Sequence, residues 1–152
     1  MIINKNLILD YQLNGVVLIK NAISSFWLNQ ISIGIKKNFQ NPSEYKCVYE
    51  KANSKELFYD DYCNWQRIEE YKNFLFKSNV AKIASQLMSS KQVNIFHEHV
   101  LIKEPGSIKK TPWHQDQPYY CVDGKDNCSL WIPLDKVQKE ICPEFISGSH
   151  KW

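Results

Sequence analysis

Glycine is scarce in this sequence, with five positions among 152 residues. No Gly-x-Gly-x-x-Gly or phosphate-loop pattern occurs, and such loops are what bring backbone amides close to the phosphates of a nucleotide. No Ser/His/Asp elbow or cysteine-nucleophile motif occurs either. The sequence therefore argues against a nucleotide-dependent enzyme, and any catalytic chemistry must depend on other residue types.

Long hydrophobic runs are also missing. The longest apolar runs, such as Gly15–Ile19, are far shorter than the roughly 20 residues that a transmembrane helix needs. The first residues, Met1–Asn6, lack the charged, apolar and small-residue order of a signal peptide. We therefore expect a cytoplasmic protein with no membrane partner.

Basic charge is not concentrated in any part of the chain. The net charge is +3, and Arg67 is the only arginine. A nucleic-acid-binding surface normally carries a denser cluster of lysine and arginine than the scattered lysines supply. We expect no nucleic-acid partner, and only one guanidinium is available for bidentate binding of a carboxylate.

The cysteines form no recognisable framework. There are five of them, an odd number, and no two are spaced as Cys-x-x-Cys. This pattern argues against a zinc ribbon and against a secreted disulfide scaffold.

The length, with 43% hydrophobic and 23% charged residues, is typical of one soluble globular domain, so we predict a single domain over residues 1–152.

Hydrophobic periodicity predicts three helices, each with apolar residues recurring at three- and four-residue spacing. Serine precedes two of them and is a favoured N-cap residue. The polar stretch Asn41–Tyr62 is predicted to be a long loop. The predicted helices run from Ser24 or Ser25 to about Phe39, over Gln66–Phe76, and over Asn79–Met88 after an N-cap at Ser78.

Strand patterns open the chain and then dominate its last third, where short apolar runs are separated by turn residues. Helices first and strands afterwards indicate an α+β, mainly β domain whose second half is a sandwich or barrel. The predicted strands are Gly15–Lys20, Val93–Ile102 before a turn at Glu104–Gly106, Pro112–Gln117, Cys128–Leu134 and Glu144–Ile146.

One short motif could carry chemistry. His114 and Asp116 lie two residues apart, so on an extended backbone both side chains leave the same face. They offer an imidazole nitrogen and a carboxylate oxygen, two of the three ligands that hold non-haem Fe(II) in a 2-His-1-carboxylate site. A His-x-Asp pair alone is a weak signal, and a surface hydrogen-bonding pair is the alternative. Pro112 and Pro118 bracket the pair and stiffen the chain on either side of it. The aromatic residues that could wall a site and exclude water are Trp113, Tyr119, Tyr120 and Trp131.

A second set of metal-ligand types lies upstream. His97, His99 and Glu104 have the spacing of the first motif of cupins, which are metal-binding β-barrels. The glycine expected after that motif is absent, and Glu104 falls in a predicted Pro-Gly turn. A half-buried strand histidine is the alternative for His97. The remaining histidine, His150, could be proposed as a third ligand to the first pair, although it follows a small-residue turn near the last residue of the sequence.

Four blocks together resemble one family. The first is Leu101–Gly106, and the second is Thr111–Tyr119, which contains the His-x-Asp pair. The third and fourth are Ser129–Asp135 and Ser147–His150. Their order and spacing are similar to those of the phytanoyl-CoA dioxygenase family. The likeness is detailed over about Val93–Trp152 and looser in the first half of the chain.

The resemblance implies an Fe(II)- and 2-oxoglutarate-dependent dioxygenase on a double-stranded β-helix, a cupin-like jelly-roll barrel with helices packed outside. It makes His114 and Asp116 iron ligands. Trp131, His99 and Gln115 fall on positions that contact 2-oxoglutarate, although strand alternation points Gln115 away from the metal. The implied reaction couples decarboxylation of 2-oxoglutarate by O2 to hydroxylation of a small organic substrate, such as an acyl-CoA. A carboxylate at Asp116 favours hydroxylation over halogenation.

Two parts of the family site have no counterpart in the sequence. The distal histidine ligand and the arginine that pairs with 2-oxoglutarate follow the Gly-Ser-His motif in the family, and the sequence stops at Trp152. Arg67 lies in a predicted helix and has no motif to recommend it for that role. We therefore expect an incomplete barrel that binds iron weakly and turns over little substrate.

Overall fold

A computed structural model describes residues 2–49, 57–105 and 110–152. The chain divides into two compact units, each built from segments that are separate in the sequence. We call residues 26–77 and 95–113 the sheet unit. We call residues 1–25, 78–94 and 114–152 the α1/α4 unit.

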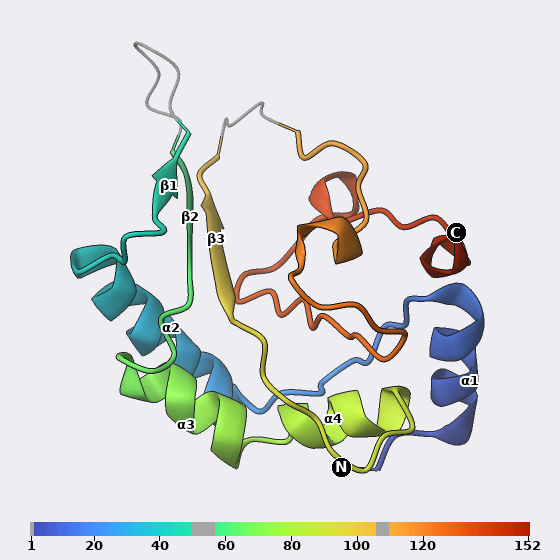
Figure 1. Cartoon of the computed structure of the whole chain (residues 1–152). Coiled ribbons are helices and arrows are strands. Elements are labelled where there is room, and N and C mark those ends of the chain that lie inside the picture. The colour runs from blue at the N-terminus through green and yellow to red at the C-terminus, as the bar shows by residue number, and fades with distance from the viewer. Residues whose placement is uncertain (1, 50–56, 106–109) are drawn as a thin grey trace. The chain divides into compact units, whose positions relative to one another are not determined.

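The sheet unit contains an antiparallel sheet of three strands in the order β1-β2-β3 (Figure 1). The central strand β2 (Phe58–Tyr62) pairs on one side with β1 (Cys47–Val48). On its other side β2 pairs with β3 (His99–Lys103), with Asp61 opposite Val100 and Tyr62 opposite His99. Two helices complete the unit, α2 (Ser25–Gln40), whose first residue falls just outside it, and α3 (Glu69–Lys77).

The core of the sheet unit combines apolar residues with buried polar side chains. Ile68, Tyr71 and Val100 are buried together, and Ile31 and Ile35 of α2 pack against them. Helix α2 passes close to Tyr71 at Gly34, where an added Cβ would lie 2.6 Å from a ring carbon of Tyr71.

Asp61 of β2 is fully buried beside this core. It accepts hydrogen bonds from Asn38 Nδ2 at 2.7 Å, from Tyr59 Oη at 3.1 Å and from both the backbone and hydroxyl of Ser43. A buried carboxylate needs such donors, because burial alone would disfavour its charge. Burial opposes ionisation, yet the hydrogen bonds from Ser43 and Asn38 outweigh it and lower the pKa of Asp61.

The α1/α4 unit is built on two helices, α1 (Lys5–Asn14) and α4 (Val80–Leu87). Ile83 and Leu87 of α4 are buried together with Ile3, and partly buried apolar residues of α1 pack against them. The side chain of Asn4 caps the start of α1 by accepting from the backbone of Asn6 at 2.8 Å. Gly15 ends α1 in the left-handed conformation, and its N–H donates to Tyr11 O. This is the usual way in which a glycine closes a helix.

The rest of the α1/α4 unit, residues 114–152, contains three short 3-10 helices and no strand. They are η1 (Gln117–Tyr119), η2 (Lys139–Ile141) and η3 (Ser149–Lys151). Many large apolar side chains in this segment are exposed, including Tyr119, Trp131, Ile141, Phe145 and Trp152.

The three predicted helices are confirmed, with boundaries shifted by one to three residues. Asn79 rather than Ser78 is the N-cap of α4, and Asn79 makes no side-chain cap hydrogen bond there. Helix α1 was not expected, because its apolar residues are not gathered on one face. The predicted loop Asn41–Tyr62 is wrong in part, since it contains β1 and β2; residues 50–56 lie outside the described residues, as does Gly106 of the predicted turn.

The mixed α/β class is confirmed, but several predicted strands are wrong. Gly15–Lys20 begins with the helix-ending glycine, and Val93–Ile102 is a strand only from His99 onward. Pro112–Gln117, Cys128–Leu134 and Glu144–Ile146 form no strand either. A strand exists only where a neighbour completes its hydrogen bonds. Proline removes a donor at residues 112, 118 and 133, and Pro118 lies within η1. The jelly-roll barrel remains a prediction.

In the described ranges, no helix is long and apolar enough to cross a membrane. All five cysteines carry free thiols.

Candidate functional site

His114 and Asp116 lie next to each other in the α1/α4 unit. The His114 Nε2 atom is 3.3 Å from Asp116 Oδ1. The backbone is not an extended strand here, because Asp116 has φ −72° and ψ −34° and its carbonyl accepts from the N–H of Tyr119 at 2.9 Å as η1 begins. The bend that starts η1 therefore accompanies the close approach of the two side chains.

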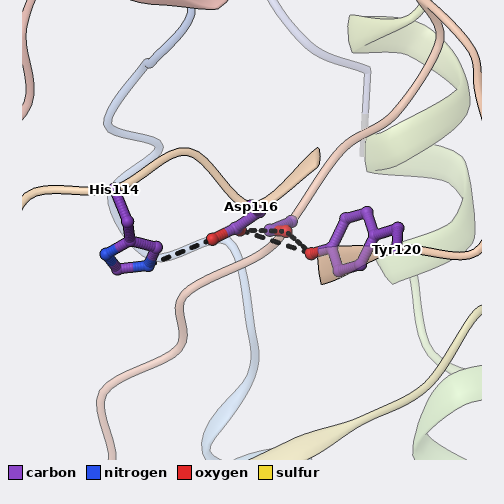
Figure 2. A network of polar contacts seen from close by, with 4 residues as sticks. His114, Asp116 and Tyr120 are labelled. Carbon is purple, nitrogen blue, oxygen red and sulfur yellow. Dashed lines mark hydrogen bonds and ion pairs between the residues drawn. The ribbon is translucent and has the colours of Figure 1, made fainter. Parts of the chain in front are cut away.

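The other carboxylate oxygen of Asp116 is held by two hydroxyl groups. Asp116 Oδ2 accepts from Tyr120 Oη at 3.3 Å and from Ser129 Oγ at 3.2 Å. Figure 2 shows the His114 ring on one side of the carboxylate and the Tyr120 hydroxyl on the other. Burial and the Asp116 carboxylate raise the pKa of Tyr120, while its hydrogen bond with Ser129 acts in the opposite direction. Tyr120 is therefore protonated at neutral pH and available as a donor.

The geometry of the pair fits two donors of one metal ion. Ligand atoms about 2.1 Å from a metal and at right angles to each other are about 3.0 Å apart, close to the observed 3.3 Å. An imidazole nitrogen and a carboxylate oxygen are also the donor types of the non-haem Fe(II) site. The side chains are 39% and 51% exposed, so an ion and small molecules can reach them.

No third protein ligand accompanies the pair in the part of the chain that the structure describes. There, no group of three or more His, Cys, Asp or Glu side chains is placed to hold a metal. His150 lies at the end of α1, with Nε2 3.3 Å from the carbonyl oxygen of Gln12. The Arg67 side chain is bound within the sheet unit, where its Nε donates to Asn64 Oδ1 at 2.7 Å.

The residues assigned to 2-oxoglutarate lie in different surroundings. Gln115 Nε2 donates to the carbonyl oxygen of Ser149 at 2.7 Å. Trp131 lies in the same unit and is 53% exposed. His99 is the first residue of β3 in the sheet unit and is exposed. Gln115 thus lies between His114 and Asp116 in the chain, but its side-chain amide nitrogen is bonded to Ser149.

The upstream set is not assembled as a metal centre. The rings of His97 and His99 are 6.3 Å apart between centroids, and both lie beside the ring of Tyr62. Glu104 follows β3 and extends the ladder through its N–H, which donates to Leu57 O at 2.9 Å. The three residues form no metal-binding group in the described ranges.

Tyr120 and Ser129 were missed as partners of Asp116 by sequence reasoning. Tyr120 was noted only as an aromatic neighbour, although it follows Asp116 by four residues, a spacing that a helical turn brings into contact. Ser129 begins the third family block. Only the folded chain places it beside Asp116, so no local sequence pattern predicts this contact.

The comparisons with known proteins agree with the four sequence blocks. The model of the phytanoyl-CoA dioxygenase (PhyH) family matches residues 11–152. A Caenorhabditis elegans protein named "Probable phytanoyl-CoA dioxygenase" is 23% identical over 93% of this chain and 51% of its own length. The chain thus spans about half the length of that relative. No solved structure matches significantly. Because the family model covers nearly the whole chain, the protein belongs to the phytanoyl-CoA dioxygenase family.

Proposed function

We propose that this protein takes part in Fe(II)- and 2-oxoglutarate-dependent hydroxylation of a small organic substrate. An acyl-CoA thioester is the substrate class that the family name suggests. The observation that carries the proposal is the approach of His114 Nε2 to Asp116 Oδ1, in a chain that belongs to an oxygenase family. The family's jelly-roll barrel and a single domain over residues 1–152 are parts of the same proposal.

In this proposal His114 and Asp116 supply two iron ligands. Tyr120 and Ser129 occupy Asp116 Oδ2 and leave Oδ1, on the His114 side, to face the metal. Groups that orient a ligand in this way raise the affinity and precision of metal sites. Fe(II) with 2-oxoglutarate and O2 would supply the oxidation of a substrate carbon, with succinate and CO2 as the other products.

The co-substrate contacts are proposed from family position. They are His99, Gln115 and Trp131. Trp131 offers an exposed indole that can pack against an organic acid, and His99 offers an exposed imidazole. Each of these side chains can be replaced without removing a residue from an apolar core, so their roles can be tested separately from folding.

The test is anaerobic Fe(II) titration of the protein, followed by succinate release from 2-oxoglutarate in air. We expect His114→Ala and Asp116→Ala each to weaken Fe(II) binding by more than the roughly 10- to 100-fold that loss of an outer-sphere partner costs. Asp123→Ala, which removes an exposed carboxylate outside the pair, is the matched control and should bind Fe(II) as the unchanged protein does. Equal binding by all four proteins, or no binding by the unchanged protein at any Fe(II) concentration in the titration, would refute the proposal.

A cupin-like metal site at His97, His99 and Glu104 is the second candidate. The neighbouring imidazole rings of His97 and His99 favour it. In the same titration, loss of Fe(II) binding with His99→Ala but not with His114→Ala would support this candidate over the first.

A further inference from the structure

The segment Ser147–Lys151, which we call the capping segment, covers the C-terminal end of α1. The last carbonyl groups of a helix have no partner within it and must bond to other groups. Gly148 N–H donates to Asn14 O at 2.8 Å, and Lys151 Nζ donates to Leu13 O at 2.9 Å. In Figure 1 this dark red turn lies beside the blue helix α1.

Two side-chain contacts extend the cap. Ser147 Oγ donates to Asn14 Oδ1 at 2.7 Å, and His150 Nε2 lies 3.3 Å from Gln12 O. A lysine at this end of a helix also interacts favourably with the partial negative charge of the helix dipole. The Gly-Ser-His motif, which the proposed chemistry leaves without a role, thus binds the end of a helix more than 130 positions earlier in the sequence.

Gly15 makes room for this cap. Its φ of +78° is a conformation that glycine adopts readily and other residues rarely adopt. A Cβ at this position would lie 2.3 Å from Nδ1 and 2.7 Å from Cγ of His150. The imidazole ring therefore occupies the space beside Gly15, and a side chain there would displace it.

The capping segment is also bonded to the candidate metal pair. Gln115 lies between His114 and Asp116, and its Nε2 donates to Ser149 O at 2.7 Å across 34 positions of sequence. The same short turn is therefore hydrogen-bonded to the end of α1 and to the residue between the two ligands. The pair itself precedes η1 and lies in no strand or helix, so the bond from Gln115 to Ser149 restrains the backbone between the two ligands.

We infer that Gln115 is a positioning residue, which holds His114 and Asp116 in register by binding the capping segment that α1 carries. The inference uses the proposed metal pair, but its structural part does not need the metal. Donor atoms must be held within about 0.5 Å of the productive geometry for strong metal binding. The amide nitrogen of Gln115 makes the positioning bond to Ser149. This role is distinct from any contact that its carbonyl oxygen makes with 2-oxoglutarate.

The first test is binding of Co(II) alone, without 2-oxoglutarate, measured by visible absorbance. We expect Gln115→Leu and Gln115→Glu to weaken Co(II) binding about 10- to 100-fold, as loss of other orienting partners does, with a melting temperature within a few degrees of the unchanged protein. Gln117→Leu is the matched control, because Gln117 Nε2 donates to Val122 O at 2.5 Å and so loses the same kind of bond one residue past the pair. Equal losses in Gln115→Leu and Gln117→Leu, or no loss in either, would overturn the inference.

A remote variant tests the route through the capping segment. Lys151→Met removes the bond to α1 without touching the pair. We expect it to weaken Co(II) binding several-fold in the unchanged protein and to have little further effect when Gln115 is already leucine, since contacts in one network are not additive. Equal effects in both backgrounds would show that α1 does not act through Gln115.

A readout without metal separates this inference from the proposed function. The His114 and Tyr119 rings meet edge to face with centroids 6.1 Å apart, so the His114 proton resonances should be shifted by the tyrosine ring. We expect Gln115→Leu to move these resonances toward their values in an unstructured peptide and Gln117→Leu to move them less. If the unchanged protein binds no Co(II), the proposed function fails, and the histidine resonances still decide the role of Gln115.

Discussion

The segments His97–His99 and His114–Asp116 have ligand-type side chains at the same spacing and different geometries. The first enters β3, and its two rings are 6.3 Å apart. The second enters η1, and its donor atoms are 3.3 Å apart. An extended chain points the side chains of residues i and i+2 the same way, with their Cα atoms about 6.6 Å apart. At the bend of Asp116, the two donor atoms come within 3.3 Å of each other. Spacing alone therefore selects a shared face, and the backbone turn decides whether two side chains can share an ion.

The middle residues of the two segments act alike. Glu98 accepts from the backbone amides of Asn64 and Trp65, the latter at 3.1 Å. Gln115 donates to Ser149 O. In both cases the middle side chain binds a turn 33 or 34 positions away in sequence. One difference is that Glu98 can ionise whereas Gln115 cannot. Burial raises the pKa of Glu98, and the hydrogen bonds from Asn64 and Trp65 act in the opposite direction.

The largest expected difference between the two segments is the loss in free energy of unfolding when the middle side chain is removed. We expect Glu98→Ala to lower the free energy of unfolding by about 2–3 kcal/mol, because two amide groups lose their acceptor in the sheet unit. Gln115→Ala should cost less than about 1 kcal/mol, because its bond is exposed. Urea unfolding measures both, and Glu98→Gln, which retains an acceptor oxygen, is the control. Equal costs for the two alanine variants would contradict the comparison.

Low pH should destabilise the strand pair β2–β3, which His97–His99 leads into. Asp61 lies in β2 beside Val100 of β3, and its pKa is lowered in the folded protein. A lowered folded-state pKa adds stability above the unfolded value near 4, and this stability is lost as the pH falls further. The raised pKa of Glu98 acts in the opposite direction and offsets part of the loss.

We therefore expect Asp61→Asn to cost on the order of 2 kcal/mol at pH 7 and to flatten the fall in stability between about pH 5 and pH 3. Urea unfolding at several pH values measures this dependence. Ser43→Ala is the companion variant, because it removes a hydroxyl donor that favours the charged form of Asp61, and it should flatten the fall in part. An acid dependence that Asp61→Asn does not alter would assign the loss to other carboxyl groups.

The smallest expected effect concerns the hydroxyl groups on Asp116. We expect Tyr120→Phe and Ser129→Ala each to weaken Co(II) binding by a few-fold to about 10-fold, because each removes one of two bonds to Oδ2. Neither change should alter binding in a protein that already carries Asp116→Ala. The titration by visible absorbance measures both, and an effect that persists without the carboxylate would show that the hydroxyl groups act by another route.

The helices were predictable because their apolar residues repeat locally. Helix α4 has Val80, Ile83 and Leu87 on one buried face, and such spacing is visible without any tertiary contact. The strands Cys128–Leu134 and Glu144–Ile146 were predicted wrongly, because an apolar run becomes a strand only beside a partner. The opposite error occurred at Asp61. Two adjacent acids favoured a loop, but in the structure they lie in a strand, because Asn38 and Ser43 donate hydrogen bonds to the buried Asp61 carboxylate.

The sequence by itself determined the family, through four blocks in a set order, and the pairing of His114 with Asp116 as candidate ligands. The tertiary structure decided what surrounds them. Tyr120 and Ser129 meet Asp116 Oδ2, and the Gly-Ser-His motif caps α1 and binds Gln115. The physical reason is that ligand identity is a property of single residues, whereas the bonds that orient a ligand join segments whose distance only the folded chain establishes.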